Sequence, residues 1–350
     1  MNRKPIFSRE SFSLCEVPVP EGYPQSQTHA GVAVNGDNYY LTTSPYPGPI
    51  YSLWVSRFRK LVRILTRGRL CASPSGEMYE NPCLYLGEGG GNVPPSRFKL
   101  MQKSPLMETP EGFYGLPSYN SDPDIFIEEG IIHIMNRSII RTKTYKDKPY
   151  DFLTRIYLMK GLDENGHFKL LSNQLVLEGQ ENYVSPSLVK FRGRYVVAFL
   201  DNHLVNRRVL FNNLFLSVSD NVEDAIIAKG RCPIKINASH LTPWHMSLFH
   251  HNDSMYAIVT CVEEGDTSLR MWQMLGEFNG NLREMTIYPT PLCDYNSYRG
   301  AAFVKEDGTF VFYSTTKWEK ISGSKSVDGR EIVVASCMFD DLLLRIKKEP

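Results

Sequence analysis

Ionisable and polar residues begin five similar phrases in this chain of 350 residues. Each phrase continues through an apolar run and a tight turn into a second run rich in aromatic residues. The residues at the five starts are His29, Asp122 with Asp124, Ser185, Trp244 with His245, and Arg299. Histidine titrates near neutral pH and carboxylates titrate below it, so a fold that gathered these side chains would have groups that donate and accept protons. The spacing therefore predicts acid–base chemistry at a shared site.

The five phrases have the pattern of β-hairpins. Apolar runs flank turns of permissive residues, such as Asn35-Gly-Asp-Asn38 and Glu306-Asp-Gly308, and this is a hairpin signal. The phrases begin at 29, 122, 185, 245 and 299, so their starts are 93, 63, 60 and 54 residues apart. A four-stranded propeller blade takes about 40–50 residues, and a ring of blades leaves few open sheet edges. The sequence predicts an all-β fold, a five-bladed β-propeller with four-stranded antiparallel blades.

One domain is expected. With 42% hydrophobic and 12% aromatic residues, the chain has enough apolar material for a large β core. We expect a single propeller domain over 27–340, an irregular N-terminal segment over 1–26 and a C-terminal tail over 341–350. The basic stretch at 54–70 departs from the β pattern and predicts either an amphipathic helix or two strands with outward arginines.

Composition limits the partners. The formal net charge of +1 gives no basic field that would attract nucleic acid, and no apolar run is long enough for a membrane span. The seven cysteines include no CxxC pair, which argues against a disulfide framework and a zinc site. The absence of a signal peptide predicts a cytoplasmic protein, or a secreted or periplasmic one if a signal has been trimmed. Oligomeric state does not follow from the sequence.

A propeller would bring the five starts together, because the innermost strand of every blade begins at one mouth of the central channel. The second strand of each blade returns to the same rim. It would add further side chains, namely Ser44, Tyr46, Asn136, Arg137, Asp201, Asn202, Thr260, Glu263, Ser314 and Trp318. Polar groups that converge on a channel mouth are the usual place to look for a binding site.

The phrase Ser121-Asp-Pro-Asp-Ile-Phe126, the motif Glu80-Asn-Pro82 and the aromatic hairpins resemble the five-bladed propeller glycosidases, the group of arabinanases, β-xylosidases, invertases and anhydro-galactosidases. The resemblance implies a glycoside hydrolase of carbohydrate metabolism and polysaccharide degradation. In that group a first-blade Asp is base or nucleophile, a second-blade Asp orients and tunes pKa, and a third-blade Glu is the acid. Asp122 matches the second role. His29 and Ser185 stand where the other two carboxylates are expected.

The resulting hypothesis is hydrolysis of an oligosaccharide or polysaccharide by carboxylate and histidine groups. The candidate catalytic residues are Asp122, His29, His245 and Glu181. The candidate substrate-binding residues are Asp124, Tyr46, Arg137, Ser185, Asp201, Trp244, Arg299 and Trp318. No cofactor is expected; the resemblance allows a structural calcium in the channel, but no acidic loop with ligand spacing supports one. The alternative is a glycan-binding propeller that has lost catalysis.

Structural roles compete with these assignments. Asp122 before Pro123 fits a turn that enters a strand, and the two histidines fit roles as hydrogen-bonding core residues. Arg299 fits a counterion for Asp122 in the channel. Two carboxyl groups about 5–5.5 Å apart would indicate a retaining glycosidase, and about 6.5–9.5 Å an inverting one.

Overall fold

The computed structural model describes residues 3–21, 26–46, 61, 65, 80–88, 93–102, 105–108, 110, 118–141, 152–205, 208–227, 231–317 and 330–348. Trp318 and, apart from 61 and 65, the basic stretch at 54–70 lie outside the described residues. None of the described helices is long and apolar enough to cross a membrane.

Strands dominate the described secondary structure, which confirms the all-β class. The first sheet consists of β2 (Gln27–Asn35), β3 (Asn38–Pro45), β4 (Cys83–Gly87) and β5 (Phe98–Leu100). The second consists of β6 (Tyr119–Glu128), β7 (Ile131–Arg141), β8 (Phe152–Glu164) and β9 (His167–Gly179). The last consists of β18 (Ser297–Val304), β19 (Thr309–Thr316), β20 (Ile332–Met338) and the N-terminal β1 (Ser13–Leu14).

The remaining sheet has eight strands and is built from two antiparallel runs of four. The first run consists of β10 (Tyr183–Phe191), β11 (Arg194–Val205), β12 (Arg208–Ser219) and β13 (Cys232–Asn237). The second consists of β14 (Leu241–His251), β15 (Ser254–Glu263), β16 (Trp272–Phe278) and β17 (Glu284–Ile287). The outermost strands of the two runs, β13 and β17, pair in parallel and join the runs into one sheet.

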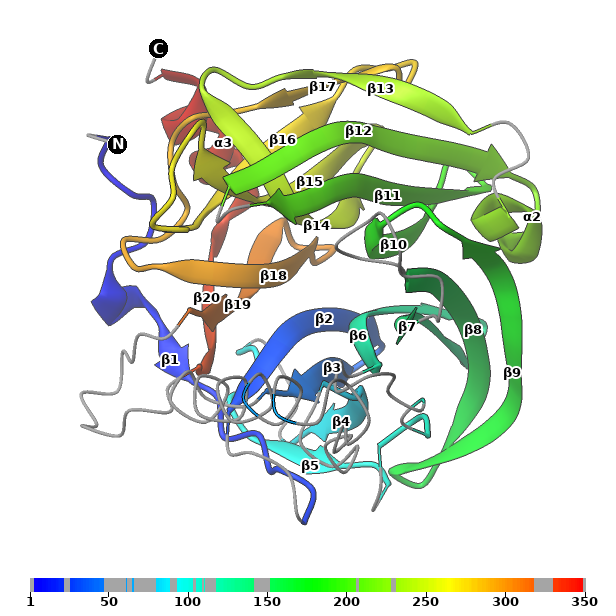
Figure 1. Cartoon of the computed structure of the whole chain (residues 1–350). Helices are drawn as coiled ribbons and strands as arrows, with labels where there is room; N and C mark the ends of the chain where they lie inside the picture. The colour runs from blue at the N-terminus through cyan, green and yellow to red at the C-terminus, as the bar shows by residue number, and fades with distance from the viewer. Residues whose placement is uncertain are drawn as a thin grey trace.

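The first strands of the five runs form a closed ring. β2 contacts β6, β6 contacts β10, β10 contacts β14, β14 contacts β18, and β18 contacts β2 again. Figure 1 shows these strands around the centre, with later strands of each run placed further out. The ring thus brings together the starts of all five phrases, which are far apart in the sequence.

Local sequence explains the hairpins that open the runs. Each turn between a first and second strand contains a residue in the left-handed region, where glycine and asparagine are tolerated best. These residues are Gly36 (φ +59), Gly130 (φ +78), Gly193 (φ +76), Asn252 (φ +51) and Gly308 (φ +82). The turn at Asp163-Glu-Asn-Gly166 has the same property, since Asn165 and Gly166 both have positive φ.

The core lies between neighbouring sheets. One apolar cluster joins residues of β14–β16 to residues of β18–β20, and others fill the spaces between the remaining runs. Side chains from both faces of most strands are buried, because each sheet is covered on two sides. A short helix, α2 (Val222–Ile227), adds Val222, Ala225 and Ile226 to the cluster between the β6–β9 sheet and the β10–β13 run.

Both end segments of the chain contain regular secondary structure, including an edge strand of the kind that the sequence allowed near the N-terminus. The segment expected to be irregular contains the 3-10 helix η1 (Arg9–Ser11) and β1, which pairs with β20. The expected tail is the helix α3 (Phe339–Lys348), which buries Phe339, Leu342 and Ile346. These three residues lie on one face of a helix, so α3 covers the end of the core that would otherwise be exposed.

Candidate active site

Every strand of the inner ring is interrupted near its start by a β-bulge. The register shifts lie between Thr28 and Gly31 in β2, Ser121 and Asp124 in β6, Val184 and Ser187 in β10, Pro243 and His245 in β14, and Ser297 and Gly300 in β18. A bulge redirects the side chains of the extra residues out of the regular alternation. Most of the residues predicted from the phrase starts lie in or next to these bulges.

Three of the bulges place a non-glycine residue in the left-handed region. The residues are His29 (φ +58), Asp122 (φ +52) and Ser185 (φ +51), at equivalent positions in β2, β6 and β10. This conformation is uncommon for residues with a Cβ, and such strain clusters at functional sites. The repeated strain marks the mouth of the ring as the candidate active site.

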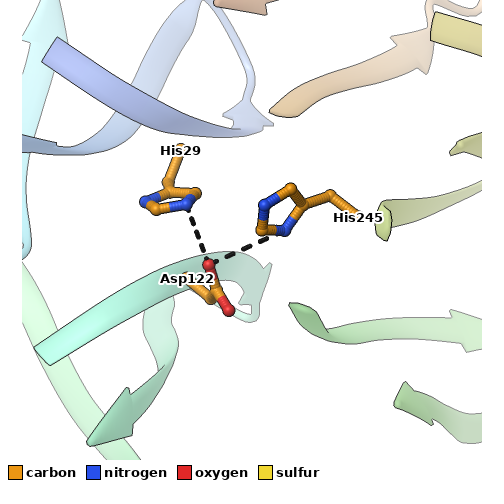
Figure 2. Close-up of side chains that lie close together, drawn as sticks. All are labelled: His29, Asp122 and His245. Carbon is orange, nitrogen blue, oxygen red and sulfur yellow. Dashed lines mark ion pairs between the residues drawn. The ribbon is translucent and has the colours of Figure 1, made fainter. Parts of the chain in front are cut away.

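Asp122 lies at the centre of a network of polar contacts. Its Oδ1 is 3.0 Å from His29 Nε2 and 3.8 Å from His245 Nδ1. Its Oδ2 accepts hydrogen bonds from Arg137 Nη1 at 3.1 Å and from the Ser185 backbone amide at 3.2 Å. Figure 2 shows the two imidazole rings approaching the carboxylate from β2 and β14 on either side.

This network sets the charge of the central groups. Burial alone would raise the pKa of Asp122, but electrostatic interactions with His29, His245 and Arg137 hold that pKa well below its usual value. Burial lowers the pKa of His245 well below its usual value, against the opposing effect of the Asp122 charge. At neutral pH the pocket therefore holds an ionised Asp122 next to a neutral His245 imidazole.

Glu80 is a second carboxylate on the other side of His29. Its Oε2 lies 3.1 Å from His29 Nδ1, so the imidazole stands between Glu80 and Asp122. Glu80 was not among the predicted catalytic residues. The Glu80-Asn-Pro82 motif was the signal that could have identified it.

A pocket of about 440 Å³ opens over these groups, and His29, Glu80, Asp122 and His245 all line it. Aromatic side chains form much of its wall, contributed by Tyr46, Tyr119, Trp244 and Tyr298. The Tyr298 ring packs against both imidazoles, with centroids 5.1 Å from His29 and 4.6 Å from His245. The pocket thus combines ionisable groups with the flat apolar surfaces on which a ring-shaped ligand can stack.

A buried arginine fixes two of the aromatic walls. The Arg330 guanidinium stacks on the Tyr46 ring at 3.7 Å and on the Tyr298 ring at 4.1 Å, and its Nη1 donates to Thr28 Oγ1 at 2.7 Å. Stacking on two rings and a hydrogen bond to β2 hold this corner of the pocket in place.

The structure brings six of the predicted site residues to this pocket and leaves the other described ones outside its lining. The six are His29, Tyr46, Asp122, Arg137, Trp244 and His245. Ser185 lies behind His245, where its Oγ is 2.7 Å from Nδ1. Asp201 is not among the residues that line the pocket, and it contacts His203 and Asn212. The pocket also contains Tyr119, Asn182, His203 and Tyr298, which the sequence did not single out.

Three predictions need correction. Glu181 is exposed in the turn before β10 and does not line the pocket, because the strand that enters the ring begins only at Tyr183. Arg299 is fully buried and donates to Asp124 Oδ1 at 3.1 Å and to the Pro123 carbonyl at 2.8 Å, so its direct ionic partner is Asp124, and its charge helps to lower the pKa of Asp122 only from a longer distance. Asp124 faces away from the pocket, since the bulge after Ser121 breaks the alternation that would place it beside Asp122.

One group of His, Cys, Asp and Glu side chains in the described part of the chain is close enough to share a metal ion. Ligand atoms of His29, Asp122 and His245 all lie within 4.8 Å of one another. Calcium, which the family resemblance allows, takes six to eight oxygen ligands. Two imidazoles and one carboxylate do not match that donor set, so this cluster does not fit calcium.

Comparison with known proteins identifies the fold. No family model matches the sequence, and no curated protein matches it. Among solved structures, a Bacteroides ovatus xyloglucan-locus protein designated GH43B aligns with a TM-score of 0.56 and 12% identity over 93% of this chain. This chain spans about half of that protein, since the alignment covers 54% of it.

Two further structures match over most of both chains. A GH43_1 enzyme from Xanthomonas citri complexed with xylotriose has a TM-score of 0.56 and 9% identity, and the alignment covers 93% of this chain and 89% of that one. A family 117 glycoside hydrolase from Zobellia galactanivorans has a TM-score of 0.54 and 10% identity over 94% and 90%. The likeness confirms the resemblance to propeller glycoside hydrolases at the level of the fold.

Proposed function

We propose that this protein is a glycoside hydrolase that cleaves a glycosidic bond of an oligosaccharide or polysaccharide in the pocket over Asp122. Fold alone does not decide among the activities that a propeller can host. The observation that carries the proposal is the arrangement of Glu80, His29 and Asp122 at the floor of an aromatic-walled pocket. We also propose that the ring is a single domain of five blades, the eight-stranded sheet being two blades joined along their outer strands.

The roles follow from charge and position. A sugar ring stacks on Trp244 and Tyr298, and Arg137 donates to its hydroxyl groups. Glu80, the more accessible of the two carboxyl groups, donates its proton to the leaving oxygen as the glycosidic bond breaks. Asp122 stays ionised and stabilises the positive charge that develops on the sugar. The neutral His245 imidazole takes the proton from the attacking water, whose oxygen forms the new bond to the anomeric carbon.

One observation favours the alternative, a glycan-binding propeller without catalysis. His29 and Ser185 occupy the left-handed positions of β2 and β10, where the resembling glycosidases are expected to carry carboxylates. The aromatic walls and Arg137 would still hold a sugar without Glu80 and Asp122 acting on it.

The test is release of sugar from a panel of aryl xylosides, arabinofuranosides and galactosides and of plant and algal oligosaccharides. We expect Glu80→Gln and Asp122→Asn each to lower turnover about 10²–10⁴-fold, since each removes a group that acts on charge or protons in the transition state. Asp220→Asn changes an exposed carboxylate that pairs with Arg194 and is the matched control.

The outcomes separate the two candidates. Release of sugar that Glu80→Gln and Asp122→Asn abolish, with Asp220→Asn unaffected, supports the hydrolase. Saturable binding of a saccharide without release supports the glycan-binding alternative. A protein that neither binds nor cleaves any member of the panel contradicts both.

A further inference from the structure

A second cavity lies at the opposite end of the ring from the candidate active site. Its volume is about 410 Å³, and it opens between the β10–β13 run and the β16–β17 turn of the next run. Strand β10 runs from one cavity to the other, because Val184 near its start lines the candidate active site and Phe191 at its end lines the second cavity. The two cavities are therefore separate sites.

The second cavity has an apolar floor and a basic rim. The floor is formed by core residues of β11, β12 and β13, namely Val196, Leu216 and Ile234. The rim carries three exposed arginines, which are Arg192, Arg194 and Arg283. A site of this composition suits a ligand that has an apolar face and acidic groups beside it.

Two of the three arginines keep a charge that no carboxylate balances in the described part of the chain. Arg194 Nε pairs with Asp220 Oδ1 at 2.9 Å. Arg192 instead donates to two backbone carbonyls, which carry no net charge. The Arg283 side chain forms no ion pair with any described residue. The rim therefore attracts acidic groups from outside.

The other four interfaces between neighbouring runs show what this one lacks. At each of them, a segment outside the strands adds apolar side chains to the core. Helix α2 does so between β6–β9 and β10–β13, and helix α3 does so between β14–β17 and β18–β20. Met101 and Leu106 lie between β2–β5 and β6–β9, and Cys15 lies between β2–β5 and β18–β20.

Among the described residues, the cluster between β10–β13 and β14–β17 contains only residues of these strands and of the turns that join them. The second cavity lies at this interface, where the other interfaces have a covering segment. The cavity is thus the space that such a segment would fill.

Helices α2 and α3 lie at the same end of the ring as the second cavity. Helix α2 follows β12, whose last residue Ser219 pairs with Tyr195 beside the β10–β11 turn. The Phe339 amide at the start of α3 donates to the Gly308 carbonyl in the β18–β19 turn at 3.0 Å. The two helices therefore show which kind of structure covers this end of an interface.

The two helices share a sequence pattern. Helix α2 reads Val222-Glu-Asp-Ala-Ile-Ile227, and α3 begins Phe339-Asp-Asp-Leu-Leu-Leu344. In both, an apolar residue is followed by two acidic residues and then by apolar residues that are partly buried. Glu223 of α2 pairs with Lys160 of β8 at 2.5 Å, so an acidic group of the covering helix meets a cation of the neighbouring run.

We propose that the second cavity binds an acidic amphipathic helix of a partner protein, which covers this interface as α2 and α3 cover theirs. The apolar side chains of the partner helix fill the floor over Val196 and Leu216. Its acidic side chains meet the arginine rim, as Glu223 meets Lys160. This mode is the helix-in-groove recognition of an amphipathic segment, with charge complementarity at the edge.

The docking surface goes beyond the proposed function and does not depend on it. The second cavity lies at the other end of β10 from the groups around Asp122, and peptide binding is measured without a saccharide. Binding of the helix by a protein that releases no sugar would refute the hydrolase alone. Release of sugar by a protein that binds no helix would refute the docking surface alone.

The test uses two alanine-rich peptides of about 16 residues, because shorter helices are marginal in water. One carries Val-Glu-Asp-Ala-Ile-Ile at its centre, and the other carries Phe-Asp-Asp-Leu-Leu-Leu. Fluorescence anisotropy of each labelled peptide is followed while the full chain is added. We expect saturable one-to-one binding of at least one peptide, weakened by salt and lowered at least about tenfold when Asn and Gln replace its Asp and Glu.

Variants of the protein locate the binding. Arg283→Glu reverses a charge of the rim, and Val218→Glu places a charge in the cavity wall, so each should lower peptide affinity at least about tenfold. The matched control is Arg208→Glu, which reverses an exposed arginine at the other end of β12 and should bind like the wild type. Circular dichroism shows whether each variant is folded.

Three results would overturn the proposal. The first is that neither peptide binds, including the case in which a small apolar anion such as decanoate binds instead. The second is that the peptides with Asn and Gln bind as tightly as the acidic ones. The third is that folded Arg283→Glu and Val218→Glu both bind like the wild type, which would place the peptide elsewhere on the protein.

Discussion

Asp122 and Asp124 are both buried and lie two residues apart on β6, but their side chains make different contacts. Asp122 lines the pocket and contacts His29, Arg137 and, at longer range, His245. Asp124 is enclosed by neighbouring strands of the ring. It accepts hydrogen bonds from Ser187 Oγ, from the Leu188 amide and from Arg299.

The pKa values of the two carboxyl groups shift in opposite directions. Burial raises the pKa of Asp124 to about 6, although Arg299 and the amide of Leu188 oppose it. The pKa of Asp122 is instead held low by its cationic neighbours. A regular strand would place residues 122 and 124 on one face. The bulge and the left-handed Asp122 separate them into a pocket layer that carries chemistry and a layer beneath it that joins strands.

The largest expected effect is that substitution of Asp122 affects mainly turnover, whereas substitution of Asp124 affects mainly stability. Asp122→Asn should lower turnover about 10²–10⁴-fold and cost less stability than Asp124→Asn, because the partners His29 and Arg137 line the pocket whereas the partners of Asp124 do not. Asp124→Asn should lower stability and leave KM and kcat of the folded fraction near wild type. Kinetics and thermal melts of both variants test this, and equal loss of turnover in both would remove the distinction.

Arginines offer the next test of the two layers. Arg299→Met leaves Asp124 buried without its cation, and breaking a buried pair costs about 3–5 kcal/mol of unfolding free energy. Arg137 lines the pocket, and Arg137→Met should lower the unfolding free energy by less than half as much as Arg299→Met. Urea unfolding of the two variants gives the comparison. An Arg137→Met variant as unstable as Arg299→Met would show that the pocket layer is also structural.

The sequence was sufficient to predict the ring of hairpins, but not which side chains belong to the pocket layer and which to the layer beneath it. Period-2 runs and turn residues such as Gly130 and Gly308 identify hairpins, and the spacing of five phrases is sufficient for the order of strands. The position of Glu80 was not recoverable in the same way. It lies outside the five phrases and reaches the pocket only through the packing of the segment before β4.

The bulges explain the remaining errors. Alternation along a strand predicts that Asp124 accompanies Asp122 and that Arg299 reaches the same carboxylate. An extra residue in the strand reverses which side chains face the pocket, and no pattern in a single sequence announces a bulge of this kind. The helix α3 was missed for a different reason, since it has only ten residues and its apolar run Leu342–Leu344 fits a strand as well as a helix.

The smallest expected effect concerns backbone strain, and two serines on β10 isolate it. Ser185 has a φ of +51 and Ser187 does not lie in the left-handed region. Both hydroxyls make buried hydrogen bonds, to His245 and to Asp124, so Gly and Ala substitutions lose them equally at each position. The difference between Gly and Ala then reports the backbone alone.

At Ser185 the glycine variant should be more stable than the alanine variant by about 1 kcal/mol, because a Cβ is unfavourable at positive φ. At Ser187 the order should reverse by about 0.5–1 kcal/mol, because glycine loses more chain entropy in an extended strand. Denaturant unfolding of the four variants measures both differences. A reversal of sign within two residues would show that the strain belongs to the pocket layer, whereas the same sign at both would mean that the left-handed position costs the fold nothing.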